Sequence, residues 1–116
     1  DTLGGRRSPR ADTPDGPRIP AGWYDDLRPG DYCGPVLGYT GDVPSVSFLK
    51  PNARDADAPV AARGMQHVCS PPHTFTEEPD GTLTISASIS DRKAAQVDGP
   101  GDGWHGYLER GTWREV

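Results

Sequence analysis

Residues 73–89, with the sequence HTFTEEPDGTLTISASI, decide the fold. Four apolar residues alternate with four hydroxyl residues in its second half: Leu83, Ile85, Ala87 and Ile89 against Thr82, Thr84, Ser86 and Ser88. A period of two predicts a strand with one buried face and one polar face. The tripeptide at 79–81, Pro-Asp-Gly, joins this strand to an extended run at 73–78, and Asp-Gly between two such runs predicts a hairpin.

Shorter strand patterns lie on both sides of this hairpin. They cover residues 32–40, 43–49, 65–69, 104–108 and 112–116, with a turn at Arg110 and Gly111. The chain also holds 15 Gly and 13 Pro, which disfavours long helices. We therefore predict an all-β fold, a small antiparallel β-sandwich or barrel of about six short strands. Residues 50–63 and 91–103 lack apolar alternation and are expected to be loops.

The first twenty residues, DTLGGRRSPRADTPDGPRIP, have a different composition from the rest. They hold four Pro, three Gly and four Arg, and only two large aliphatic residues, Leu3 and Ile19. Such a stretch cannot bury enough apolar surface to fold alone. We expect residues 1–21 to form a flexible or docking arm, and residues 22–116 to form a single β-domain. The sequence leaves two interpretations open: the arm is disordered, or it becomes ordered when it binds a partner.

The net charge of the chain limits the kinds of molecule that it is expected to bind. The chain carries 17 acidic and 12 basic residues, for a formal net charge of −5. An acidic surface repels phosphate groups, so general nucleic-acid binding and membrane binding are not expected. No stretch reaches the roughly 20 apolar residues that a membrane span needs. A protein partner is expected instead, and the sequence leaves homo-oligomerisation open.

Three segments carry a resemblance to a known group of proteins. They are DYCGPVLGYTGDVPSVSFLKPN at 31–52, QHVCSPPHTFTEEPDGTLTISASI at 66–89, and the ending GWHGYLERGTWREV at 103–116. Together they resemble a family of small uncharacterised proteins of actinobacterial phages. The resemblance implies a viral setting, either the host cytoplasm or the virion, and favours a protein that binds other proteins.

The second half of the chain also resembles a bacterial and phage domain family of unknown function. The likeness rests on Ser88-Ile89 and on the closing run Trp104-His105-Gly106-Tyr107. The Cys-Gly-Cys-Gly cluster of that family is absent here, and neither resemblance brings an activity that could be carried over residue by residue.

Three residues of the sequence have a spacing that is compatible with a zinc site. His67, Cys69 and His73 could supply three zinc ligands, with Cys33 and His105 as distant additions. Ordinary packing is the competing interpretation, because a zinc signature normally has two closely spaced ligand pairs. Cys33 and Cys69 are the only cysteines, and the sequence leaves open whether they form a disulfide or stay as thiols.

Catalytic motifs are not found. There is no Gly-x-Ser-x-Gly elbow and no phosphate-binding Gly-rich loop with Lys, and the acidic residues at 77, 78 and 80 are interpreted as a solvated turn. We assign no catalytic residues and expect a non-enzymatic protein with no cofactor. Its expected partner-binding residues are Arg6, Arg7, Arg10, Arg18, Trp23 and Tyr24. The alternative is a zinc-stabilised domain, with or without catalytic activity, that uses His67, Cys69 and His73.

Overall fold

A computed structural model describes residues 2–40, 43–51, 65–70, 72–91 and 104–115. It contains the predicted central hairpin, formed by β8 (Thr74–Glu77) and β9 (Leu83–Asp91) with Phe75 opposite Ile85. The Glu78 amide donates to the Thr82 carbonyl at 2.9 Å, and Gly81 has a φ of 86°. Gly is suited to this position because a side chain would strain a positive φ.

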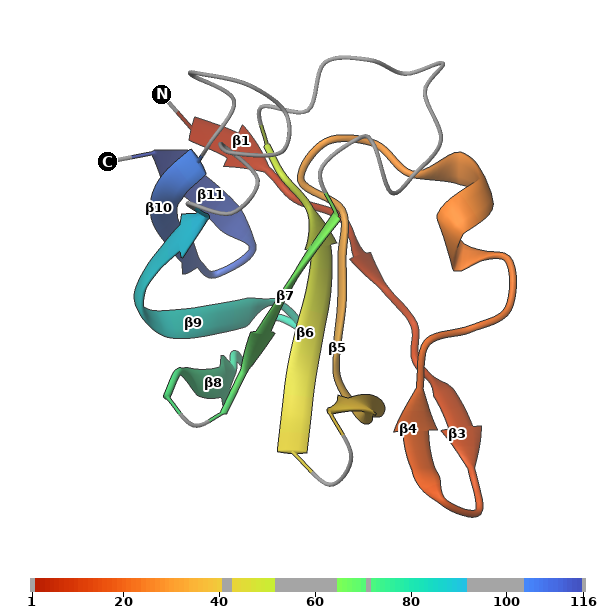
Figure 1. Ribbon diagram of the computed structural model, residues 1–116. Coiled ribbons are helices and arrows are strands. Elements are labelled where there is room, and N and C mark those ends of the chain that lie inside the picture. The colour runs from red at the N-terminus through yellow and green to blue at the C-terminus, as the bar shows by residue number, and fades with distance from the viewer. Residues whose placement is uncertain (1, 41–42, 52–64, 71, 92–103, 116) are drawn as a thin grey trace.

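Two sheets form the body of the molecule (Figure 1). The first, sheet A, has the strand order β1-β11-β10-β9-β8 and is antiparallel throughout. Its remaining strands are β1 (Thr2–Gly4), β10 (Trp104–Glu109) and β11 (Thr112–Glu115). The second, sheet B, has the order β2-β5-β6-β7.

Sheet B combines one parallel pair with two antiparallel pairs. Its strands are β2 (Arg7–Ser8), β5 (Tyr32–Thr40), β6 (Val43–Leu49) and β7 (Met65–Cys69). β2 runs parallel to β5, whereas β5 with β6 and β6 with β7 are antiparallel. The bounds of β6 and β7 agree with the sequence prediction.

The core lies between the two sheets. Its buried residues come from both of them: Tyr32, Val46, Phe48, Val68, Leu83, Ile85, Ile89, Leu108 and Trp113. The prediction that one face of β9 is buried is thus confirmed. Trp113 of sheet A is 1% exposed and packs on Phe48 of sheet B, with ring centroids 4.8 Å apart. Its indole N–H donates to the Gly30 carbonyl at 2.6 Å, so this large ring is buried with its polar atom satisfied.

The last hairpin, formed by β10 and β11, does not place its two tryptophans opposite each other. Trp104 and Trp113 would face each other only if the turn lay at residues 108–109. In the structure Leu108 is opposite Trp113, and Trp104 is opposite Asp91 of β9. The tight turn at Arg110 and Gly111 sets this register, because both residues have a positive φ and connect the two strands directly.

The expected division into an arm and a domain differs from the structure. β1 pairs with β11, and β2 pairs with β5, so residues 2–8 add strands to both sheets. β3 (Ala11–Thr13) and β4 (Gly16–Arg18) then form a small hairpin, and a 3-10 turn follows at Trp23–Asp26. Short Pro- and Gly-rich segments become strands here because existing strand edges supply their hydrogen-bond partners.

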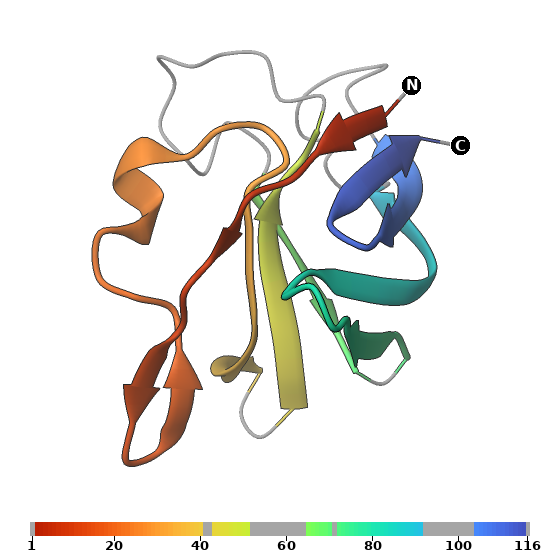
Figure 2. The ribbon, with the colours of Figure 1, turned by 180° about the vertical axis from the view of Figure 1, so that it is seen from behind.

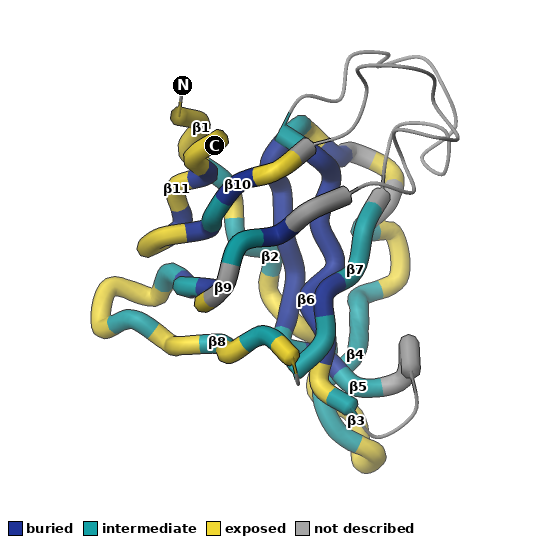
Figure 3. Tube along the Cα trace, turned by 60° about the vertical axis from the view of Figure 1, so that its left-hand side comes forward, coloured by how far each residue is buried: buried dark blue, intermediate teal, exposed yellow. Residues whose placement is uncertain are grey.

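Residues 5–31, hereafter the N-terminal layer, add β2 to the edge of sheet B and from β3 onward run along the face of that sheet that lies away from sheet A (Figures 1 and 2). The sheet B residues that alternate with the core are also buried: Cys33, Val36, Ser45, Ser47 and Leu49. Contacts from the layer reach this face, because the Cys33 thiol bonds the Pro9 carbonyl and a Cβ on Gly16 would lie 2.8 Å from Leu37 Cδ1. Figure 3 shows mostly buried residues along β5 and β6, and exposed or intermediate residues in β3, β4 and β8.

The described residues form eleven strands, one 3-10 turn and no α-helix. The all-β, sandwich-like class is confirmed, whereas the strand count exceeds the expected six because the N-terminal strands were not foreseen. The described part of the chain contains no helix with the length and apolar character needed to cross a bilayer. Most of the two predicted loops, residues 52–64 and 92–103, lies outside the described residues.

Candidate protein-binding site

Arg7 links the two sheets. Its guanidinium donates to both carboxylate oxygens of Glu77 at 2.6 and 2.7 Å, to the Gly81 carbonyl at 3.2 Å and to the Gly34 carbonyl at 2.8 Å. Glu77 and Gly81 belong to the β8–β9 hairpin, and Gly34 belongs to β5. Only 17% of the Arg7 side chain is exposed. Planar, forked geometry makes Arg suited to such bidentate pairing with a carboxylate.

The ion pair shifts both partners toward their charged forms. Hydrogen bonds from Arg7 hold the pKa of the Glu77 carboxyl below its ordinary value of 4.5, and the same bonds raise the pKa of Arg7. Because 54% of the Glu77 side chain is exposed, solvent screens the pair and limits its contribution to stability. The sequence interpretation of residues 77, 78 and 80 as a solvated turn did not include this pair, in which Glu77, the last residue of β8, is solvent-exposed and bonds Arg7.

Arg6 fixes the turn before β5. Its Nε and Nη2 atoms donate to the two oxygens of Asp31 at 2.9 and 2.6 Å. The Asp31 side chain is 4% exposed and also accepts the Arg28 amide at 2.9 Å. A buried carboxylate needs such partners, since an unpaired charge would be costly to desolvate. Arg6, like Arg7, is occupied by a contact within the fold.

Trp23 is also held from within the N-terminal layer. Its indole N–H donates to the Ser8 hydroxyl at 2.6 Å, and the residue is half-buried. Tyr24 lies in the same 3-10 turn. The two aromatic residues predicted to bind a partner therefore sit in a turn that packs against β2, and the Tyr24 side chain lies outside the described atoms.

Arg10 and Arg18 differ from Arg6 and Arg7. Arg10 is exposed, and its Nη1 atom donates to the Pro35 carbonyl at 3.0 Å. That bond uses one of the five N–H donors of a guanidinium. Arg18 lies on β4 opposite Ala11 and is half-buried. In the described part of the chain neither arginine has an ion-pair partner within 4.0 Å.

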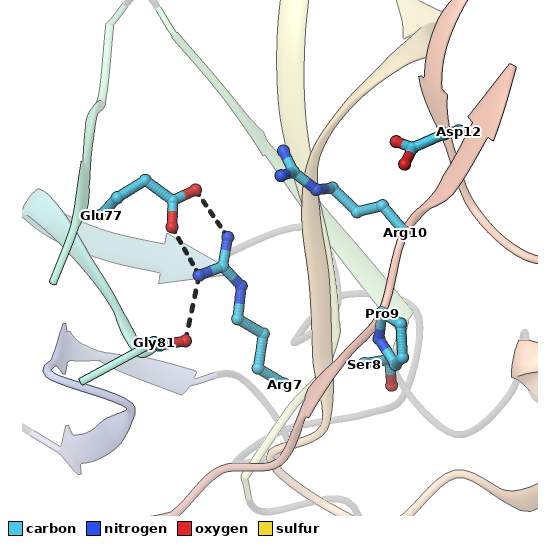
Figure 4. Close-up of a pocket in the computed structure, with 7 residues that line it drawn as sticks. All are labelled: Arg7, Ser8, Pro9, Arg10, Asp12, Glu77 and Gly81. Atoms are coloured by element: carbon cyan, nitrogen blue, oxygen red, sulfur yellow. Dashed lines mark hydrogen bonds and ion pairs between the residues drawn. The ribbon is translucent and has the colours of Figure 1, made fainter. Parts of the chain in front are cut away.

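A hollow of about 420 Å³ separates the β8–β9 hairpin from the N-terminal layer. It is lined by Arg7, Ser8, Pro9, Arg10, Asp12, Glu77 and Gly81. Arg7 fills its inner end, and the side chains of Arg10 and Glu77 point toward each other from opposite walls (Figure 4). The hollow thus joins two of the predicted partner-binding arginines with an acidic residue that sequence reasoning did not select.

The predicted metal ligands are not assembled into one cluster. His67 and Cys69 share a face of β7, and the His67 Nδ1 atom lies 2.6 Å from the Ser47 hydroxyl. His73 instead turns toward β9, with its Nε2 atom 3.3 Å from the Ser88 carbonyl. Across the described ranges, no three His, Cys, Asp or Glu residues gather where they could hold a metal ion. Zinc binding by these residues stays a prediction.

Cys33 and Cys69 do not form a disulfide with each other in the structure. They lie on β5 and β7, with β6 between them. Two inter-strand spacings amount to about 9 to 10 Å, which exceeds the separation of Cα atoms that a disulfide can bridge. Burial raises the pKa of the Cys33 thiol and so disfavours its reactive thiolate form.

Comparison of the chain with protein-family models, with curated proteins and with solved structures finds no match. The geometry and charges of the hollow are therefore the available guide to function. No sequence motif marks Glu77 as part of this site, because its partner Arg7 lies 70 residues away in the chain.

Proposed function

We propose that the protein is a non-enzymatic binding protein that contacts an acidic segment of a protein partner at the hollow. The observation that supports this most directly is the state of Arg10. It is exposed at the hollow, it has a single hydrogen bond to a backbone carbonyl, and no carboxylate of the described structure lies within ion-pair distance of it. An arginine in this state can take a carboxylate through two parallel hydrogen bonds.

The neighbouring charges favour a local contact over general attraction. Arg7 already neutralises Glu77, which leaves Arg10 and the exposed Asp12 as the other charged groups of the hollow. The net charge of −5 would repel an acidic partner at long range. At physiological ionic strength, however, charges more than about 8 Å apart are largely screened, so contacts within the hollow dominate.

The proposal extends to the setting that the resemblance to small phage proteins implies. We propose that the partner is a virion component or a host protein, and that the protein resides in the virion or the host cytoplasm. Proteomics of purified virions separates these two locations, because a virion component copurifies with the particle and a host modulator does not.

Site-specific photo-crosslinking in the natural host tests the role of the hollow. A photoreactive amino acid at position 12, on the rim of the hollow, should capture the partner in higher yield than one at Glu115, on the exposed side of β11. Arg10→Glu should abolish that capture. Arg28→Glu removes an equally exposed arginine outside the hollow and should leave the yield unchanged. Equal yields from positions 12 and 115, or insensitivity to Arg10→Glu, would contradict the proposal.

A further inference from the structure

The free edge of sheet A lies next to the hollow. β8 is the last strand of that sheet and pairs only with β9 among the described strands. The Glu78 amide donates to the Thr82 carbonyl. Hydrogen-bonded pairs alternate along an antiparallel ladder, so Thr76 and Thr74 also direct their backbone groups toward β9. The backbone N–H and C=O groups of Phe75 and Glu77 therefore point away from the sheet.

This edge has few of the features that keep other chains away. Natural edge strands are blunted by Lys, Pro, bulges, short length or inward-pointing charges, and of these β8 has only its length of four residues and the charge of Glu77. The run Thr-Phe-Thr-Glu has no Lys and no Pro, and its pairing with β9 is regular over all four residues. Its single charge, on Glu77, is neutralised by Arg7 on the inner side. An extended segment could pair with Phe75 and Glu77 without a backbone rearrangement.

The position of Arg10 specifies what such a segment should carry. Strands in a sheet lie about 4.8 Å apart, and alternate side chains point to the same face. A residue paired beside Glu77 would thus place an inward side chain in the space between Glu77 and Arg10 (Figure 4). Its neighbours there would be the unused donors of Arg10. A carboxylate is the side-chain group that complements them.

We propose that the partner binds as an extended strand added to the edge of β8, with one Asp or Glu side chain in the hollow on Arg10. This inference rests on the proposed function and specifies its geometry. Main-chain hydrogen bonds to Phe75 and Glu77 provide the pairing, and the carboxylate selects the sequence.

The test uses the full chain and a Thr-rich, end-capped nine-residue peptide with one central Glu, alongside its Gln counterpart. NMR titration should shift the amide resonances of Phe75 and Glu77 and slow their hydrogen exchange. The Glu peptide should bind about tenfold or more tightly than the Gln peptide, because hydrogen bonds to charged groups contribute roughly 1.5 to 3 kcal/mol. Arg10→Gln should remove that preference, and Arg28→Gln should preserve it.

Two further Glu peptides test the strand geometry directly. One is N-methylated at its odd positions and the other at its even positions. Only one of these sets can face β8, so one peptide should lose binding and the other should retain it. Equal effects of the two patterns, or shifts confined to other edges, would overturn strand addition at β8.

The proposed function and the strand-addition geometry would be contradicted by different results. A preference for Glu that depends on Arg10, without protection of the Phe75 and Glu77 amides, would overturn strand addition and leave the proposed function intact. Protection of those amides with equal affinity for the Glu and Gln peptides would overturn the acidic partner. Absence of binding by both peptides at millimolar concentration would overturn strand addition.

Discussion

The space between sheets A and B and the space between sheet B and the N-terminal layer are held together by different interactions. The first is filled by large apolar side chains centred on Trp113, Phe48 and Tyr32. The second is spanned by polar contacts, in which Arg7 donates to the Gly34 carbonyl, Arg10 to the Pro35 carbonyl, and the Cys33 thiol to the Pro9 carbonyl. No described residue before Tyr32 belongs to the core cluster.

This difference has consequences for stability and for binding. Apolar burial contributes about 25 cal/mol per Å², independent of direction, whereas exposed ion pairs contribute on the order of 1 kcal/mol or less. The core should therefore set global stability. The N-terminal layer should open at lower free energy, and it exposes Arg10, the arginine that the proposed function uses. Four predictions test this contrast, from the largest expected effect to the smallest.

Ile85→Asp should abolish cooperative folding at room temperature. Ile85 is 1% exposed within the core, and an unpaired carboxylate there would be desolvated without a partner. Ser86→Asp is the matched control, because Ser86 is exposed on the other face of the same strand. Circular dichroism during urea titration measures both variants. A folded Ile85→Asp protein of unchanged stability would show that the core is not where the structure puts it.

Deletion of residues 1–21 should lower the free energy of unfolding by more than about 2 kcal/mol while leaving a cooperative transition. The truncation removes the partners of Asp31 and Glu77 and uncovers the Cys33 region of sheet B. Differential scanning calorimetry of the two chains measures the change. A melting temperature equal to that of the full chain would mean that the segment is an independent arm, as its composition alone suggests.

Arg7→Gln should cost about 1 to 3 kcal/mol, because it removes both bonds to Glu77 and leaves the Gly34 carbonyl without this donor. Arg18→Gln removes the same charge from the same part of the chain and should change stability by less than about 0.5 kcal/mol. Urea unfolding followed by tryptophan fluorescence compares the two. Equal effects would indicate that net charge, and not the contact between the sheets, determines the result.

Acid should weaken the fold through His67 and Glu77 in separate pH ranges. Burial lowers the pKa of His67 below its ordinary value of 6.5, so the unfolded chain binds a proton at a higher pH than the folded chain does. The His67 contribution to stability is complete above about pH 6.5 and falls as the pH drops through that value toward the folded pKa. The Glu77 contribution, with its pKa held down by Arg7, is present above about pH 4.5 and is lost below it.

Thermal melts between pH 8 and 5 should therefore show a decline in wild-type stability that is smaller in His67→Gln. Glu77→Gln should keep that decline and remove part of the later loss below pH 4.5. If His67→Gln and the wild type have parallel pH profiles, His67 does not carry the near-neutral dependence.

The sequence by itself determined the local parts of the fold. Alternation from Thr82 to Ile89 is a property of adjacent residues, and a strand needs only one apolar partner face to make use of it. The Asp80-Gly81 turn likewise acts over a few residues, so the β8–β9 hairpin and the limits of β6 and β7 could be predicted. The two thiols and the arginines were visible as candidates, although their roles were not.

Only the tertiary structure determined which strands residues 2–31 form and where they pair. β1 forms because β11, more than 100 residues later, offers an open edge, and β2 forms because β5 does. Arg6 and Arg7 are neighbours in the sequence and could both bind a partner. In the structure Asp31 binds Arg6 and Glu77 binds Arg7, whereas Arg10 has no such carboxylate contact and is exposed. Such long-range pairing depends on where the folded sheets bring distant charges together, and neither composition nor periodicity encodes that distance.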